Sequence, residues 1–350
     1  MPSVITRLLI LCCALLAAGC DPSPPEIVLS GPTMGTTYTV KVASPPATVD
    51  PASVRVAIDD VLEQVDRSMS GYRVDSEVAR FNASAATDWC DVSADLAAVV
   101  QTSIDISAAS DGVFDVTVAP LVAAWGFGPA GEPKVLPSAG QLAQLETIVG
   151  YRKLHARLDP PALRKDVAGL SIDLNGIAPG FAVDRLAERL QAMRIENYMI
   201  DIGGEIRARG RNARDEPWHV AVEHPVETQR TPYTSVWLDG AAVSTSGEYR
   251  SYYERDGRRY SHTVDPRTGR TLDREPGAVV VVAPLAAEAD GWATALNVLG
   301  PRDGLALATQ RKMPVLFIER DGSEWRSQAT PEFERYAKKE VSKSGQDEQD

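Results

Sequence analysis

Short runs of alternating apolar and polar residues recur in pairs along this 350-residue chain, and these pairs constrain its fold most strongly. In "NYMIDIGGEIRARG" (197–210) two such runs are separated by Gly203-Gly204, and "LHARLDPPALRKDV" (154–167) holds two more around a Pro-Pro turn. Turn-joined runs are typical of antiparallel hairpins. Helical segments fall between groups of these runs. We therefore predict an α+β fold, with mixed or antiparallel sheets and helices packed between strand groups.

Residues that start and stop helices place the other elements. Asp50-Pro51 is typical of a helix start, because Asp caps the first turn and proline fits into it. Ser93 and Gly112 mark the start and the end of a second helix. We expect helices over 50–69, 93–112, 138–149, 180–193 and 285–299, with one more before 314, and further strands over 36–43, 170–176, 218–222, 233–238, 242–245, 259–264, 278–282 and 314–319.

The first twenty residues have the pattern of an export signal. Arg7 gives a positive start, and the apolar core over 8–18 is too short to span a bilayer. The ending "LAAGC" resembles a lipoprotein cleavage site, with Cys20 as the acylated first residue of the mature chain, although that pattern prefers Leu where Ala17 stands. We expect a lipoprotein signal peptide over 1–19; the alternative is a plain secreted protein cut nearby.

The residues after this signal suggest where the protein is kept. Asp21 after the cysteine resembles the signal that retains bacterial lipoproteins at the inner membrane, and a Pro-rich tether is expected over 20–30. The predicted location is therefore the periplasmic side of the bacterial inner membrane, held by a lipid anchor. One compact domain is expected over 31–336, followed by a disordered polar tail over 337–350.

Composition excludes several kinds of protein. The net charge of −12 disfavours non-specific binding to nucleic acid, whose phosphates it would repel. Once the signal is removed and Cys20 is acylated, only Cys90 remains, so the chain can form neither an intrachain disulfide nor a cysteine-based metal site. The chain also lacks the glycine-rich nucleotide loops, the zinc-protease motif and the nucleophile elbow of hydrolases. Candidate site residues are therefore weighed one by one.

Two residues of "AEADGWATAL" have the chemistry of a magnesium site. Asp290 and Thr294 are four apart on a predicted helix, so their side chains share one face. Carboxylate and hydroxyl oxygens are the hard ligands that Mg²⁺ takes, usually together with several waters. Taken alone, the pair fits an ordinary helix surface at least as well, with Thr294 bonded to its own helix.

Asp173 and His262 each end a predicted strand. Asp173 precedes Asn175-Gly176 and either presents its carboxylate to a ligand or bonds to its own turn. His262, one of four histidines, precedes the turn "DPRTG", and it is either a general base oriented by Asp265 or a residue that stabilises this turn.

The sequence allows two further arrangements. A Ser246–His262–Asp265 triad lacks a nucleophile elbow to support it. Trp125 and Phe127 in "AAWGFG" either cover a planar ring or belong to the core.

Eight stretches, in a fixed order, carry a family resemblance over almost the whole mature chain, from Thr33 to about Ile318. They are "PTMGTTY", "SEVARFN", "GVFDVTVAPLVAAWGFG", "SIDLNGIAPGFAVD", "DIGGEIRARG", "AVSTSGEYRSY", "RYSHTVDPRTG" and "ADGWATAL". Together they resemble the ApbE family of FAD:protein FMN transferases, long labelled thiamine biosynthesis lipoproteins.

The resemblance implies a mechanism and a set of site residues. Members of the family bind FAD and Mg²⁺, cleave the FAD pyrophosphate, release AMP and attach FMN through a phosphoester to a threonine of a target protein. In this sequence the resemblance implies flavin-nucleotide contacts from Met34, Tyr72, Val113, Phe114, Asp115 and Asp173, metal contacts from the Asp290 and Thr294 side chains and the Gly176 carbonyl, and a catalytic base at His262.

Some features stay open at this stage. The family usually has Lys, sometimes Glu, where this chain has Pro179, so any polar contact made there is lost or replaced. The alternatives to a transferase are an FAD pyrophosphatase, which gives FMN and AMP, and a non-catalytic flavin-binding lipoprotein. A direct thiamine-pathway enzyme is supported only by the old family label. The resemblance also implies acceptor partners among the flavoprotein subunits of sodium-pumping NADH:quinone reductase or Rnf-type complexes.

Overall fold

The centre of the molecule is an antiparallel sheet of eight strands, described here from a computed structural model that covers residues 25–226, 231–247, 251–275 and 277–337. Every neighbouring pair of its strands runs antiparallel. In spatial order they are β1 (Glu26–Thr33), β2 (Thr36–Ala43), β6 (Tyr198–Ile202), β7 (Glu205–Arg209), β10 (Ala241–Gly247), β15 (Ala278–Ala283), β16 (Val315–Asp321) and β17 (Glu324–Ala329).

Smaller sheets and the helices surround this centre. The helices are α2 (Pro51–Met69), α3 (Glu77–Ala83), α4 (Ala94–Ala109), α5 (Ala119–Ala124), α6 (Ala139–Glu146), α7 (Ala178–Ala192), α8 (Ala286–Gln310) and α9 (Glu334–Ala337). The smaller sheets are β3 (Cys90–Asp91) with β5 (Pro161–Lys165) and β4 (Leu154–Leu158), β8 (Trp218–Glu223) with β9 (Pro232–Leu238), β11 (Tyr252–Arg255) with β12 (Arg258–Ser261), and β13 (Val264–Asp265) with β14 (Arg270–Thr271).

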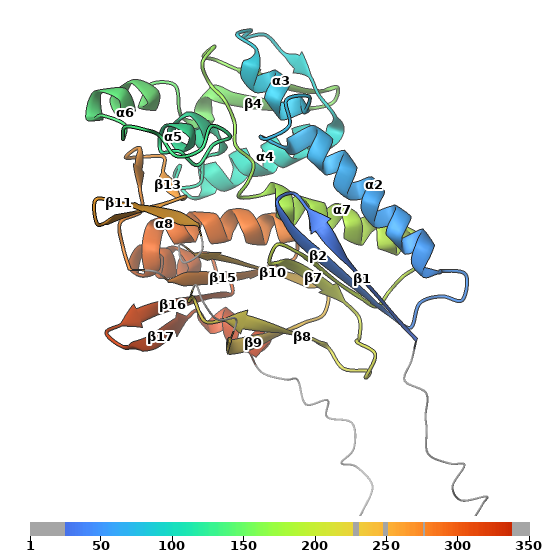
Figure 1. Cartoon of the computed structure of the whole chain (residues 1–350). Helices are drawn as coiled ribbons and strands as arrows, with labels where there is room; N and C mark the ends of the chain where they lie inside the picture. The colour runs from blue at the N-terminus through green and yellow to red at the C-terminus, as the bar shows by residue number, and fades with distance from the viewer. Residues whose placement is uncertain (1–24, 227–230, 248–250, 276, 338–350) are drawn as a thin grey trace, which may run out of the picture.

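Both faces of the sheet are covered, which explains its apolar central strands. In Figure 1, α7 and α8 lie across one face, while the β8–β9 hairpin lies on the other side. On β15, Val279 and Val281 belong to the core cluster under the helices, whereas Val280 and Val282 belong to the cluster on the hairpin side. A strand buried on both sides needs consecutive apolar residues, and "AVVVVA" supplies them. The α+β prediction is confirmed.

Helix ends follow the expected capping chemistry. The Asp50 carboxylate accepts a hydrogen bond from Ser53 N at 2.7 Å, and α2 begins at Pro51. The last expected long helix is present too, but α8 continues through a bend at Gly300. In the described residues no helix is both long enough and apolar enough to cross a membrane.

Three sequence predictions are wrong in detail. Residues 170–176 do not form a strand, because the backbone of Ile172 is bonded to the side chain of Asn82 and not to another strand. The strand predicted over 259–264 is interrupted at His262 and Thr263, between β12 and β13.

The third error concerns the tether predicted over 20–30, since 26–30 belong to β1. The signal peptide, Cys20 and the polar tail from residue 338 lie outside the described residues.

Candidate active site

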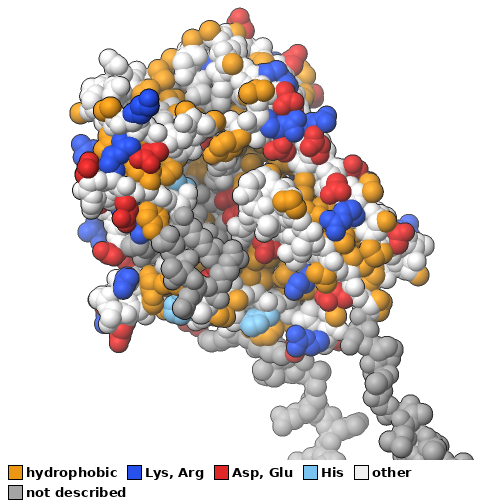
Figure 2. All heavy atoms as spheres, viewed as in Figure 1, with side chains coloured by type: hydrophobic (Ala, Val, Ile, Leu, Met, Phe, Trp, Pro, Cys, Tyr) orange, Lys and Arg blue, Asp and Glu red, His pale blue; other side chains and the backbone are white. Residues whose placement is uncertain are grey.

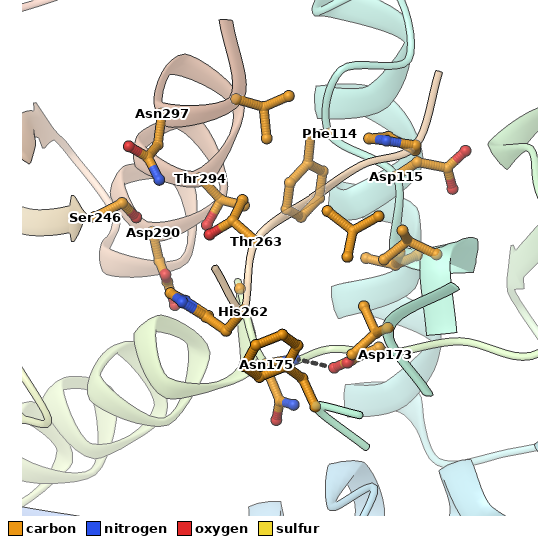
Figure 3. A pocket seen from close by; sticks show the side chains of 18 of the residues that line it. Phe114, Asp115, Asp173, Asn175, Ser246, His262, Thr263, Asp290, Thr294 and Asn297 are labelled. Carbon is orange, nitrogen blue, oxygen red and sulfur yellow. Dashed lines mark hydrogen bonds between the residues drawn. The ribbon is translucent and has the colours of Figure 1, made fainter. Parts of the chain in front are cut away.

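A cavity of about 400 Å³ lies between α8, the end of β10 and the segment around His262 (Figure 3). Figure 2 shows this face of the molecule hollowed near its centre, with acidic and hydrophobic side chains around the hollow. The part of the cavity wall on α8 and β10 is mostly polar, whereas other parts of the wall carry apolar residues such as Phe114, Val116 and Phe127. A site with one polar and one apolar wall suits a ligand that has both planar rings and charged groups.

The three predicted metal residues are brought together. Asp290 is 5% exposed, and its Oδ2 accepts a hydrogen bond from Gly180 N at 3.1 Å. Thr294 follows one turn later on α8 and also lines the cavity. A Cβ on Gly176 would lie 2.9 Å from Thr294 Oγ1, so only glycine allows the backbone of this loop to lie against Thr294.

Among the described residues, no cationic side chain lowers the pKa of Asp290. Burial raises the pKa of Asp290 to about 7. Glu205, the first residue of β7, has a pKa well above its ordinary value because of burial and, next, the nearby charge of Asp290. A buried carboxylate with a second carboxylate close enough for its charge to raise that neighbour's pKa has the electrostatics of a cation site. The predicted ligand set thus fits a hard divalent cation such as Mg²⁺.

The predicted metal ligands include few charged groups. Within the ranges that the structure describes, no three or more His, Cys, Asp or Glu side chains gather in the manner of a metal cluster. Asp290 is the one carboxylate in the predicted set, beside a hydroxyl and a backbone carbonyl. Such a set leaves most coordination positions to water and substrate, as is usual for Mg²⁺.

His262 lies in the break between β12 and β13, and its ring is held by the backbone. Its Nδ1 lies 3.0 Å from the carbonyl oxygen of Ser251, which also accepts from His262 N at 3.0 Å. A carbonyl can only accept, so Nδ1 carries the proton and Nε2 is the basic nitrogen of the neutral ring. His262 and Thr263 both line the cavity (Figure 3).

The expectation that Asp265 orients His262 is wrong. The Asp265 carboxylate accepts from Arg267 Nε at 3.0 Å and Nη2 at 2.9 Å, because Arg267 is only two residues away on the same turn. The Ser251 carbonyl takes the orienting role instead. Ser246 also lines the cavity, but the pairing of Asp265 with Arg267 leaves the Ser246–His262–Asp265 triad unassembled.

Most of the predicted flavin-contact residues line the same cavity, and one does not. Tyr72, Val113, Phe114, Asp115 and Asp173 lie around it. Met34 lines a neighbouring cavity of about 610 Å³. The two cavities share Tyr72 and Asn175, so an extended ligand can reach from one to the other.

The two aspartates on the apolar side differ in how their carboxylates are used. Asp115 Oδ1 accepts from Thr117 N at 2.8 Å and from Thr117 Oγ1 at 2.6 Å, and Oδ2 accepts from Tyr151 N at 2.7 Å. A ligand would therefore meet the backbone near Asp115 more readily than its carboxylate. Burial raises the pKa of Asp173, whose Oδ1 accepts from Asn175 N at 2.8 Å.

The loop that carries Asp173 and Gly176 is held from behind by two residues without a functional signal of their own. Asn82 at the end of α3 donates Nδ2 to Ile172 O at 2.9 Å and accepts from Ile172 N at 2.8 Å. The buried Lys165 donates Nζ to Phe81 O at 3.0 Å and to Leu170 O at 2.9 Å. Asn82 belongs to the motif "SEVARFN", but its hydrogen-bond partner, Ile172, is 90 residues away and cannot be identified from the sequence.

The remaining sequence questions have direct structural answers. Pro179 stands in the first turn of α7 and lines the second cavity. Its missing N–H costs little there, since the first N–H groups of a helix have no helical partner. Phe127 lines the cavity, whereas Trp125 is core: it stacks on Tyr260 with ring centroids 5.6 Å apart and donates Nε1 to Gly269 O at 2.7 Å.

Comparisons with known proteins agree with this geometry. The model of the ApbE family matches residues 34–317. A curated FAD:protein FMN transferase of Vibrio cholerae serotype O1 is 40% identical over 325 residues, which cover 93% of this chain and 97% of the relative. The enzyme of the same name from Escherichia coli (strain K12) is 35% identical over 341 residues, covering 95% and 97%.

Solved structures give the same result. The flavin transferase ApbE from Vibrio cholerae superposes with a TM-score of 0.82 at 39% identity, covering 89% of this chain and 99% of that one. The apo form of the Pseudomonas stutzeri flavinyl transferase ApbE gives 0.83 at 39% identity, covering 91% and 98%. Fold, site and sequence agree along most of the described chain, and the chain belongs to the ApbE family.

Proposed function

We propose that this protein is an Mg²⁺-dependent FAD:protein FMN transferase, which cleaves the FAD pyrophosphate, attaches FMN to a threonine of an acceptor protein and releases AMP. The observation that carries the proposal is the meeting, in one cavity, of the buried Asp290 carboxylate, Thr294 and Gly176 with the basic nitrogen of His262. The names of the relatives support the same activity.

The metal would be held by the Asp290 carboxylate, the Thr294 hydroxyl and the Gly176 carbonyl. When bound, Mg²⁺ supplies neutralisation of the negative charge that develops on a pyrophosphate during cleavage. Glu205, beside Asp290, adds negative potential that attracts the cation.

His262 would move the proton in the transfer step. Its Nε2 accepts the proton of the acceptor threonine as the threonine Oγ forms a bond to the phosphorus of the FMN half. The bond from that phosphorus to the bridging oxygen breaks, and AMP leaves with the bridging oxygen. The Ser251 carbonyl on Nδ1 keeps the ring in the required tautomer and stabilises the imidazolium that forms.

The ligand would occupy both cavities. FAD joins two planar ring systems through a charged linker, and the polar wall of α8 and β10 suits that linker. Apolar side chains around Phe114 and Phe127, and the second cavity beyond Tyr72, suit the rings.

Mass spectrometry of an acceptor protein after incubation with FAD, Mg²⁺ and this enzyme tests the proposal. Candidate acceptors are flavoprotein subunits of sodium-pumping NADH:quinone reductase or Rnf-type complexes, which the family resemblance suggests. We expect a mass increase of one esterified FMN, together with AMP. Release of free FMN and AMP with an unmodified acceptor would favour a pyrophosphatase, and intact FAD would favour a flavin-binding protein.

We also propose that Cys20 is acylated and that the domain is held at the periplasmic face of the inner membrane. The support is the signal-like sequence over 1–20 and its "LAAGC" ending. Cys20→Ser should move the protein from the membrane fraction to the soluble periplasmic fraction. Unchanged fractionation of this variant would contradict the lipid anchor.

A further inference from the structure

A break in α8 fixes an arginine against the helix. Gly300 has a φ of 76° and is followed by Pro301. In an unbroken helix the carbonyl of Asn297 would accept from the N–H of residue 301, but proline has none. Arg274 Nη2 donates to this carbonyl instead. A Cβ on Gly300 would lie 2.9 Å from Arg274 Nη1, so glycine also leaves room for the guanidinium.

The same arginine sets the orientation of the Asn297 amide. Arg274 Nη2 donates to Asn297 Oδ1 at 2.8 Å. A guanidinium has only donors, so the atom that faces it is the oxygen, and Nδ2 points away. Asn297 lies between the small cavity of about 110 Å³ that Arg274 lines and the central cavity.

Asn297 is therefore a buried donor at the edge of the active site. The residue is 4% exposed, and among the described residues Nδ2 has no acceptor within hydrogen-bond distance. In Figure 3 its nitrogen is turned toward Thr294 and the cavity. Asp290, Thr294 and Asn297 stand at i, i+4 and i+7, so they form one row along the same helix face. An amide nitrogen that lines a cavity and has no protein acceptor among the described residues can donate to an acceptor atom of a ligand.

We infer that Asn297 is a further substrate-contacting residue, whose Nδ2 donates to a phosphoryl oxygen of the dinucleotide. This inference rests on the proposed function. The row on α8 belongs to the polar part of the cavity wall, whose side chains suit a charged linker better than planar rings. The cavity is also lined by the acidic residues Asp173, Glu205 and Asp290. The Asn297 oxygen is engaged by Arg274, so the residue offers the ligand only its N–H donors, which favour an anionic oxygen.

Binding measurements on Asn297→Asp and Asn297→Ser test this assignment. FAD affinity is measured by titration with Mg²⁺ present, and riboflavin, which has the ring but no phosphate, is measured by competition with FAD. Asn297→Asp replaces the donor with an acceptor of nearly the same shape, so FAD affinity should fall about 10- to 100-fold. Asn297→Ser, which keeps a smaller donor, should lose less. Riboflavin should bind within about twofold of wild type in both variants.

The exposed Gln310, later on the same helix, offers a matched control, because Gln310→Glu adds the same charge outside the cavity. An equal loss for FAD and riboflavin, or no loss for FAD, would overturn the assignment. Thermal melting identifies any variant that fails to fold. In that case Arg274→Gln, which frees the amide without altering Asn297, should weaken FAD and spare riboflavin. FMN transfer by the wild type is measured separately, so a failure of the proposed function is distinguishable from a failure of this contact.

Discussion

Two buried aspartates, Asp115 and Asp290, line the same cavity, and they are held in opposite ways. Asp115 accepts three hydrogen bonds from Thr117 and Tyr151, which leave its carboxylate fully engaged in the fold. Asp290 accepts one, from Gly180 N, and has a second carboxylate, Glu205, as its neighbour. Burial raises the pKa of both aspartates.

The difference shows that burial and a raised pKa do not by themselves identify a functional carboxylate. Asp115 has donors that compensate its burial, so it stabilises the turn that shapes the apolar wall. Asp290 lacks such compensation within the described residues, and a like charge lies beside it. A buried carboxylate with few hydrogen-bond donors and a like charge beside it indicates that a bound cation or a proton compensates its charge.

Replacing Asp290 should produce the largest effect on activity. Asp290→Asn removes the charged ligand, so AMP release from FAD should fall by about 10⁴-fold or more, the equivalent of several kcal/mol. The melting temperature should hold or rise, since a buried charge has been removed. The measurement is AMP release across an Mg²⁺ titration, with the exposed Asp303→Asn as control. Normal turnover by Asp290→Asn would place the metal elsewhere.

His262→Ala should give the next largest effect, on transfer alone. FMN transfer should fall about 10³-fold, within the usual range for a general base. Binding of FAD should stay near wild type, because the base is needed only when threonine attacks. Single-turnover transfer and an FAD titration separate the two. If both fall equally, His262 binds the ligand or stabilises its segment.

The stability of the metal-free protein should depend on pH through Asp290. Its folded-state pKa is about 7, above the ordinary value of 3.8 that applies when unfolded. The folded state then binds more protons between these values, so the stabilisation is complete below pH 3.8 and is lost as pH rises to 7. In a chelator, the free energy of unfolding should fall by about 2–3 kcal/mol between pH 5 and pH 8. Denaturant titrations should show this slope in wild type and a flatter one in Asp290→Asn.

Asp115→Asn should act on stability and hardly on chemistry. The amide would turn a donor toward Tyr151 N or Thr117, which costs about 2 kcal/mol for the unsatisfied group. The melting temperature should fall by a few degrees. Transfer per folded molecule should stay within a few-fold of wild type. A large loss of transfer with unchanged melting would make Asp115 a ligand for substrate and remove the contrast with Asp290.

Asp265→Asn should have the smallest effect. Its carboxylate pairs with the half-exposed Arg267 on a turn near the surface, and solvent-screened pairs of this kind are worth about 1 kcal/mol or less. The rate of FMN transfer should change less than about threefold. A loss that approaches that of His262→Ala would restore Asp265 as the residue that orients the histidine.

The sequence predicted those elements whose signals are local. Asp50-Pro51 starts α2, and the paired alternating runs around Gly203-Gly204 form β6 and β7. The strand predicted over 170–176 was wrong because the backbone of this segment is bonded to groups distant in sequence. Ile172 is bonded to the Asn82 side chain, and Asp173 N donates to Val116 O. The spacing of apolar residues along a segment carries no information about hydrogen-bond partners that are distant in sequence.

The site was predictable where a family motif names the residue, and only there. Asp290, Thr294 and His262 were named by motifs of the family, and all three line the cavity. Glu205 stands inside a quoted motif and Asn297 directly follows one, but neither carries a local signal, since their roles depend on Asp290 and on Arg274. The partner of His262 was missed because it is a backbone carbonyl, which residue type does not show.

The order of the central sheet has a consequence for how the protein matures. Strand β2 pairs with β6, joining Tyr38 to Ile202, and the cavity draws on residues from Tyr72 to Val298. Nearly the whole chain must therefore have emerged before this sheet closes and the cavity exists. An incompletely synthesised chain therefore has no catalytic centre to present, and the active site forms only after nearly all of the chain is available to fold.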